Sequence, residues 1–362
     1  MSRIKKWDIR TIKRSTTVMA TSYGKPPQEK EHVIVRVEDE DGVRGWGEST
    51  PLPEFSGETV AIVKLVLTKY LLPPLIGMES FDMGSLHESM DISIYGNNAS
   101  KAAIDTALYD LNAKKLGVPI YKLTGGKYRD KTAINRHIGI TDIKKTEKLT
   151  EEYIRQGVKS IKIKIGDKVV EDIARVKTVR STAGKDVNIR VDANGGYDIG
   201  KAVKFIRGVV DCDLEMYEQL LPANMIDEAS RLRREFGIPL CADEGVHSPA
   251  DAAEQLMKGA ADFITVKLIK TGGIYPALQI AGIAQAAGVG CVIANTFDTQ
   301  INCAACLHLA CSIPSAKTAN DLTCYATQKE MADTCHRLKD GYLYVGPEPG
   351  IGVRSLAEFQ LD

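Results

Sequence analysis

The stretch Ser160-Ile161-Lys162-Ile163-Lys164-Ile165 decides the fold, and in it two lysines alternate with three isoleucines. Alternation with a period of two is typical of a β-strand, with the isoleucines on one face and both lysines on the other. Taken alone, such a strand most often exposes its lysines to water. Because a regular series of similar segments with charged ends follows it, we expect the lysines to have a different role.

The bulk composition describes an ordinary globular chain of 362 residues, with 44% hydrophobic and 26% charged residues, which predicts one large domain and a smaller one. The 47 basic and 47 acidic residues balance, so the chain has no net positive charge that would attract nucleic acid or an anionic membrane.

The start lacks an apolar signal segment, and no run of about 18 apolar residues predicts a membrane span. Eight scattered cysteines favour a reducing cytoplasm. We expect a cytoplasmic homo-oligomer that acts on a small molecule.

The first 125 residues predict an α+β unit. Strand-like segments at 32–37 and 43–48 flank Asp41-Gly42, a strong hairpin signal. Loops are expected at 20–30 and 51–58. The clearest helix spans 98–116, with apolar residues along one stripe and a glycine just after it.

After residue 125, strand-like runs alternate with segments of helical length. This alternation predicts an α/β domain over 126–325, a TIM barrel of parallel strands. The tail, 326–362, is expected to pack back on the unit formed by 1–125. The predicted strands lie at 133–138, 160–165, 187–192, 214–218, 238–243, 262–268, 289–295 and 317–322.

Charged residues end five consecutive predicted strands at intervals of 28, 26, 25 and 24 residues. They are Lys164, Asp192, Glu218, Asp243 and Lys267. Catalytic groups of such barrels lie at the C-terminal ends of the strands. Strands two and six face each other in a ring of eight, so the two lysines are expected to approach a substrate from opposite sides.

The three carboxylates between the lysines repel one another unless a cation lies among them. Hard oxygen ligands without histidine or cysteine favour Mg²⁺, with Mn²⁺ as a substitute. Such an ion stabilises the enediolate that forms when a substrate carboxylate loses its α-proton. Lys162, on the same face as Lys164, together with the ion, is expected to favour the neutral amine of Lys164.

Three functions are consistent with this arrangement. Two opposed lysines permit removal of the proton on one face and return on the other, which is racemisation or epimerisation of an amino-acid derivative or dipeptide. One base, Lys164, suffices for a muconate-type cycloisomerase or a dehydratase of acid sugars or hydroxy acids. A barrel without activity is the third hypothesis, and the complete set of lysines and carboxylates argues against it.

Five motifs in this order resemble the enolase superfamily, in the muconate-lactonizing-enzyme subgroup. They are Lys162-x-Lys164, Asp192-Ala-Asn194-Gly, Glu218-Gln219, Ala242-Asp243-Glu244 and Lys267-Leu-Ile-Lys270-Thr-Gly-Gly273. The resemblance covers nearly the whole chain. It implies a (β/α)₇β barrel with an N-terminal α+β capping domain, whose loops near 20–30 and 51–58 close the site.

The resemblance also implies residue roles. Asp192, Glu218 and Asp243 become Mg²⁺ ligands, Lys164 and Lys267 the acid/base pair, and Lys162 a catalytic residue that tunes Lys164 and helps to hold the substrate carboxylate. Asn194 and Glu244 are implied to orient a ligand or a lysine.

The residues that select the substrate are less marked. Dipeptide epimerases of this subgroup carry Asp-x-Asp at the eighth strand, where this chain has Asp321-Leu322-Thr323. The second acid is missing, so a dipeptide is one of several candidates, and Asp321 also matches a cycloisomerase carboxylate. Further candidates for substrate binding are Thr323, Asp298, Asn295, His137, Phe55 and Tyr23. Asp298 could equally be an acid at a helix N-terminus, and His137 a structural hydrogen-bonding residue.

Cys303, Cys306, His308 and Cys311 have a spacing similar to that of metal ligands. Small apolar residues surround them, which favours a buried barrel helix.

Overall fold

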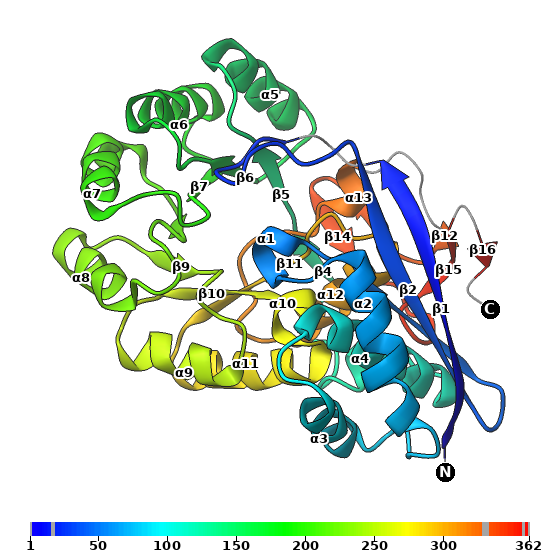
Figure 1. Ribbon diagram of the computed structural model, residues 1–362. Coiled ribbons are helices and arrows are strands. Elements are labelled where there is room, and N and C mark those ends of the chain that lie inside the picture. Colours follow the sequence, from blue (N-terminus) through cyan, green and yellow to red (C-terminus); the bar gives the residue numbers. More distant parts are fainter. Residues whose placement is uncertain (1, 16–18, 328–332, 357–358, 361–362) are drawn as a thin grey trace.

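The computed structural model describes residues 2–15, 19–327, 333–356 and 359–360 (Figure 1). Its N-terminal part is an antiparallel sheet, β1 (Ile4–Ser15), β2 (Glu29–Asp39) and β3 (Arg44–Ser49), joined in sequence order. The predicted hairpin is therefore correct, and Gly42 in its turn has φ +84°, a conformation that suits glycine.

Helices α2 (Val60–Val66) and α4 (Asn98–Lys115) pack on this sheet. The N-terminal part also contains α1 (Pro53–Ser56), η1 (Leu67–Leu71), η2 (Pro73–Leu75), α3 (Met83–Ser93) and η3 (Ile120–Lys122). Helix α4 matches the helix predicted over 98–116. It packs so closely on β3 that a Cβ at Gly45 or Gly47 would collide with its backbone.

Seven parallel strands form the barrel sheet, in the order β11-β10-β9-β8-β7-β6-β5. They are β5 (Asn135–Ile138), β6 (Ser160–Lys164), β7 (Asn188–Asp192), β8 (Met216–Glu218), β9 (Leu240–Ala242), β10 (Phe263–Lys267) and β11 (Gly290–Ala294). The segments after these strands contain α5 (Ile143–Arg155), α6 (Val169–Ala183), α7 (Ile199–Gly208), η4 (Val210–Cys212), α8 (Ile226–Phe236), α9 (Pro249–Met257), α10 (Leu268–Thr271), α11 (Ile274–Ala286), α12 (Gln300–Ser312) and α13 (Cys324–Thr327). The predicted capped (β/α)₇β architecture is confirmed at this level.

The eighth barrel position differs from the prediction of a strand over 317–322. Instead, two isolated parallel bridges, Asn320 with Ile134 and Asp321 with Ala294, connect the segment to both edges of the sheet. The predicted first strand, 133–138, is also divided. Its beginning, β4 (Lys131–Ala133), pairs with a C-terminal strand, so only β5 belongs to the barrel.

The C-terminal segment forms small sheets from β12 (Asp333–Thr334), β13 (Arg337–Lys339), β14 (Tyr342–Tyr344), β15 (Val353–Leu356) and β16 (Phe359–Gln360). It contacts the N-terminal part, because Ile351 N donates a hydrogen bond of 2.8 Å to Asp110 Oδ1 on α4. The predicted domain boundaries remain a prediction, and residues 328–332, 357–358 and 361–362 of the tail lie outside the described residues. Among the described residues, no helix combines the length and apolar composition needed to cross a membrane.

Strand β6 shows why the opening stretch is not an exposed strand. The side chains of Ile161, Ile163 and Ile165 are fully buried in the apolar layer between sheet and helices. Lys162 and Lys164, on the other face, are also buried, with exposed fractions of 2% and 8%. A buried ammonium needs carboxylate partners, and neighbouring strands supply them.

Candidate active site

Three carboxylates meet at the ends of β7, β8 and β9. One oxygen each of Asp192, Glu218 and Asp243 lies within 4.8 Å of the other two, and all three residues are buried. Burial raises the pKa of Glu218 to about 8; Lys162 opposes the shift, and Asp192 and Asp243 add to it. A cation among these oxygens would relieve their repulsion, so the triad fits a hard divalent ion.

Two lysines approach the triad from strands four positions apart. Lys164 Nζ, at the end of β6, lies 2.5 Å from Asp192 Oδ2. Lys267 Nζ, at the end of β10, donates a hydrogen bond to Asp243 Oδ2. Burial lowers the pKa of Lys267, but Asp243 and Glu244 raise it more strongly, and the net shift is upward. Each lysine is therefore paired with a different member of the triad.

Lys162 lies between the carboxylates. Its Nζ is 2.7 Å from Glu218 Oε2, 3.3 Å from Asp192 Oδ2 and 2.6 Å from Asp321 Oδ2. Burial alone lowers the pKa of Lys162, but the carboxylates of Asp321, Glu218 and Asp192 reverse the effect and raise it well above its usual value. Lys162 is consequently an ammonium that balances several acids. The expected influence of Lys162 on Lys164 remains a prediction.

A fourth lysine was not predicted as part of the site. Lys270 is fully buried in α10, one helical turn after Lys267. Its Nζ donates to Asp243 Oδ1 at 2.8 Å and to Thr265 O at 2.8 Å. The signal available in the sequence was the spacing Lys267-x-x-Lys270, which places both ammonium groups on one side of a helical turn.

Asn194 and Glu244 connect the site to the cap. Asn194 Oδ1 accepts a hydrogen bond of 3.2 Å from Lys164 Nζ, and its Nδ2 donates to Glu244 Oε1 at 3.0 Å. The same Oε1 accepts from Tyr23 OH, on the loop between β1 and β2, at 3.1 Å.

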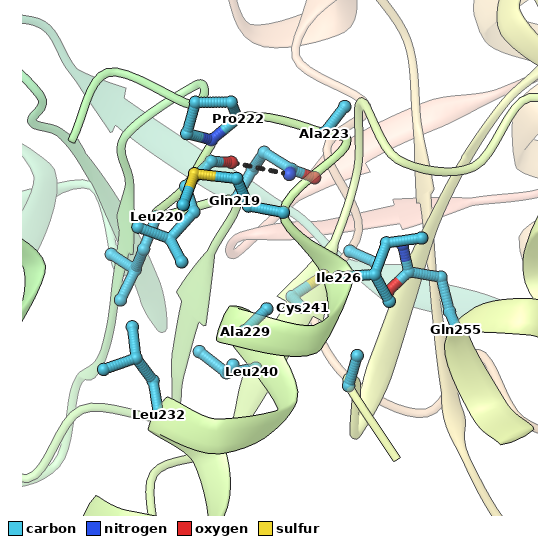
Figure 2. A pocket seen from close by; sticks show the side chains of 14 residues that line it. Gln219, Leu220, Pro222, Ala223, Ile226, Ala229, Leu232, Leu240, Cys241 and Gln255 are labelled. Atoms are coloured by element: carbon cyan, nitrogen blue, oxygen red, sulfur yellow. Dashed lines mark hydrogen bonds between the residues drawn. The ribbon is translucent and has the colours of Figure 1, made fainter. Parts of the chain in front are cut away.

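Gln219 links two of the triad strands, a role not assigned from the sequence. Its Oε1 accepts a hydrogen bond from Asp243 N at 2.9 Å. Its Nε2 donates to Leu221 O at 2.9 Å, the bond drawn as a dashed line in Figure 2. Its side chain lies beside an apolar cavity of about 30 Å³, room for one water molecule, between β8, β9 and α8. The side chain of Gln219 thus fixes the loop that carries Asp243 relative to Glu218.

A cavity of about 410 Å³ lies above the lysines. Its lining includes Lys162, Lys164, Lys267 and Asn194. All seven residues predicted to bind substrate also line it: Tyr23, Phe55, His137, Asn295, Asp298, Asp321 and Thr323. The loops near 20–30 and 51–58 therefore both contribute to the wall, and the Phe55 ring centre lies 4.4 Å from Lys267 Nζ.

Asp321 lines the cavity, and both of its carboxylate oxygens have partners within the protein, while its role in binding substrate remains a prediction. Besides Lys162, its Oδ1 accepts a 2.6 Å hydrogen bond from Asn135 Nδ2, and His137 Nε2 lies 3.4 Å away. At Thr323, the backbone N donates to Asn295 Oδ1 at 3.1 Å.

Asp298 lies just before α12 and is fully buried. Its Oδ2 accepts from Thr296 N at 3.0 Å and from Asn302 Nδ2 at 2.8 Å. Burial, together with nearby Glu48, raises the pKa of Asp298 to about 7. Asp298 thus lies just before the N-cap of α12 and also lines the cavity, and its role in binding substrate remains a prediction.

The cysteine-rich segment is the buried helix α12, as the surrounding small residues predicted. The acidic triad is the one group of described residues found with a geometry that could hold a metal ion, and it includes none of these cysteines.

The fold and the ring of lysines and carboxylates are those of a (β/α)-barrel enzyme whose acidic triad could hold a cation. Residues 8–125 match the profile described as mandelate racemase/muconate lactonizing enzyme, N-terminal domain, and residues 145–358 match the profile described as enolase C-terminal domain-like. The chain belongs to the enolase superfamily, in the muconate-lactonizing-enzyme subgroup.

Similarity to individual relatives indicates the class of reaction within this family. N-succinyl-L-Arg/Lys racemase of Bacillus cereus is 33% identical over 77% of this chain and 76% of its own length, and muconate cycloisomerase 1 of Rhodococcus opacus is 30% identical over 89% and 87%. A crystal structure of the dipeptide epimerase from Enterococcus faecalis, complexed with Mg and L-Leu-L-Tyr, has a TM-score of 0.92 and 31% identity, covering 97% of this chain and 99% of that one. These relatives are isomerases, so the prediction of an isomerase is confirmed.

Proposed function

We propose that the protein is a Mg²⁺-dependent racemase or epimerase that removes and returns the proton α to the carboxylate of an amino-acid derivative. The observation that carries this proposal is the placement of Lys164 and Lys267, which come from opposite strands and pair with different aspartates of one triad. The racemase and epimerase relatives support it.

In this proposal Asp192, Glu218 and Asp243 hold Mg²⁺ or, as a substitute, Mn²⁺. The bound ion supplies positive charge that stabilises the substrate carboxylate as the α-proton leaves. One lysine, as a neutral amine, takes the proton from one face, and the other, as an ammonium, donates a proton to the opposite face. The products are the inverted substrate and two lysines with exchanged protonation states. Proton exchange with water then restores the starting state of both lysines.

The substrate that we favour is an amino acid with an acyl group on its α-nitrogen. The free ammonium of a dipeptide needs an available carboxylate, whereas Lys162 and Asn135 each lie 2.6 Å from an oxygen of Asp321. Position 323 supplies a threonine hydroxyl in place of a second acid. The relative named for N-succinyl amino acids supports the same choice.

Exchange of the α-proton with deuterated water tests the reaction. Each enantiomer of a panel of N-succinyl amino acids and dipeptides is incubated with protein and Mg²⁺, and loss of the α-proton signal is followed by NMR. We expect exchange of both enantiomers with inversion, faster for the N-succinyl compounds. Exchange of a single enantiomer without inversion would contradict the two-base mechanism.

A one-base cycloisomerase is the second candidate, because Asp243 and the Phe55 ring favour the charged form of Lys267. If Lys267 stays protonated throughout, only Lys164 acts as a base. Turnover of cis,cis-muconate, without racemisation of any N-acyl amino acid, would support this second candidate.

A further inference from the structure

A chain of hydrogen bonds runs from the cap to one of the two proposed bases. Tyr23 OH donates to Glu244 Oε1, Asn194 Nδ2 donates to the same oxygen, and Lys164 Nζ donates to Asn194 Oδ1, at 3.1, 3.0 and 3.2 Å. We infer that Tyr23 and Glu244 are positioning residues that set the orientation of Lys164 through the Asn194 amide. This inference rests on the proposed function insofar as Lys164 is a base.

The chemistry of the three groups gives the chain a direction. An ammonium only donates hydrogen bonds, so Asn194 must present its oxygen to Lys164. A carboxylate only accepts, so Glu244 requires the NH₂ end of the same amide on the opposite side. Asn194 Nδ2 also lies 3.4 Å from Asp192 Oδ2, so the shorter bond to Glu244 is one of two contacts that keep the amide from turning its NH₂ group toward the ammonium.

Glu244 itself is held through one oxygen. Its Oε1 accepts from both Tyr23 and Asn194, while its buried Oε2 has no hydrogen-bond partner among the described residues. The phenol of Tyr23 therefore provides one of the two hydrogen bonds that orient this carboxylate. Removing the phenol leaves Glu244 with a single partner and more freedom to rotate.

The loop that carries Tyr23 is attached to the barrel at the same place. Figure 1 shows the segment between β1 and β2 reaching across to β6 and β7. Ser22 Oγ donates to Asn194 O at 3.4 Å, and Ile140 N donates to Ala20 O at 2.8 Å. A Cβ added at Gly166 or Gly196, after β6 and β7, would press on the Ser22 side chain, so both glycines leave room for the loop.

Because the hydrogen bonds from Tyr23 end at Lys164, we expect a change at Tyr23 to affect proton transfer on one face of the substrate only. The hydrogen bonds reach Lys164 on β6, whereas Lys267 on β10 is held by Asp243 and Phe55. A disturbance at Tyr23 should consequently affect proton removal from the face served by Lys164 and leave the other face largely unaffected. Replacing a residue with a merely structural role in the cap would slow α-proton exchange at both faces equally.

The test compares Tyr23→Phe and Glu244→Gln with wild-type protein in Mg²⁺ and deuterated water. The enantiomer whose α-proton still exchanges in Lys267→Ala identifies the face of Lys164. We expect its exchange to slow by about tenfold in both variants, with KM changed less than kcat. In Tyr23→Phe, exchange of the other enantiomer should change by less than about twofold, whereas Glu244→Gln also removes a charge that acts on Lys267 and so affects that face as well. Tyr95→Phe, whose side chain is 98% exposed, is the matched control.

A second measurement needs no substrate and so separates this inference from the proposed function. The rates at which Lys164 and Lys267 react with an amine-acylating reagent are compared by peptide mass spectrometry in wild-type protein and Tyr23→Phe. A changed rate at Lys164, with Lys267 as the unchanged internal reference, supports the positioning role even if no tested substrate is turned over. Equal slowing of the exchange of both enantiomers in Tyr23→Phe, or an unchanged rate at Lys164, would overturn it.

Discussion

Two clusters of buried carboxylates, one in the barrel and one formed by Glu48 and Asp298 at the seam between cap and barrel, are held by different partners. In the barrel, ammonium groups surround the acids. The members of this ion-pair ring are Asp192, Glu218, Asp243, Asp321, Lys162, Lys164, Lys267 and Lys270. At the seam between cap and barrel, Glu48 on β3 instead accepts hydrogen bonds from Thr299 N at 2.8 Å and Asn302 N at 3.1 Å at the start of α12.

The two kinds of partner suit different roles: the barrel acids are paired with groups that can transfer protons, whereas Glu48 is held in place and attaches the cap to the barrel. Backbone N–H groups at a helix N-terminus are fixed donors that cannot lose a proton in the physiological range, so they hold Glu48 permanently. His32 Nδ1, 2.8 Å from Glu48, is the nearest titratable partner. Lysines can move and exchange protons, which makes the ring suitable for proton transfer and for sharing its acids with a cation.

The largest expected effect comes from removing one lysine of the ring. Lys164→Ala and Lys267→Ala should each abolish racemisation and slow α-proton exchange of opposite enantiomers by about 10³-fold, because general acid–base groups contribute about 10² to 10⁴. NMR in deuterated water measures both. If both variants lose α-proton exchange of the same enantiomer, the lysines do not serve opposite faces.

Removing one acid of the triad should remove the response to metal. Mg²⁺ at about 100 times its dissociation constant should stabilise the wild-type fold by about 2.7 kcal/mol, and EDTA should reverse this. Glu218→Gln should weaken or abolish the shift in melting temperature, since it removes one of the three anionic ligands. Glu147→Gln, at an exposed site on α5, is the control and should retain the full shift.

At the seam the expected effect is on stability, not on proton transfer. Glu48→Gln replaces an acceptor oxygen by an NH₂ group facing buried donors, and should lower the free energy of unfolding by about 3 kcal/mol. Denaturant unfolding measures the change, with Glu40→Gln, an exposed acid of the same hairpin, as the reference. A variant that unfolds like wild type would remove the distinction between the two clusters.

The smallest effect is a pH dependence from Asp298. Its pKa of about 7 lies above the unfolded value of about 3.9, so the native state binds the proton more tightly. The resulting stabilisation is complete below about pH 4 and is lost as the pH rises through 7, at up to about 1.4 kcal/mol per unit. The free energy of unfolding of Asp298→Asn should therefore rise relative to that of wild type by about 2.6 kcal/mol between pH 5 and 8, as measured by urea unfolding. A constant difference would contradict a protonated Asp298.

The sequence determined the barrel and the positions of its charged strand ends. Alternation in Ile161-Lys162-Ile163-Lys164-Ile165 fixes which side chains share a face, and a spacing of about one βα unit brings the ends of successive strands to one rim. Both are local properties of the backbone, so they can be read from neighbouring residues.

Only the tertiary structure decided how these groups are paired. The contacts of Lys162 with Asp321, of Glu48 with Thr299 and of Tyr23 with Glu244 join residues 159, 251 and 221 positions apart. Closure of the barrel by two bridge residues, and seating of the cap on it, set these distances. No local period specifies them, because they depend on how whole elements pack against one another.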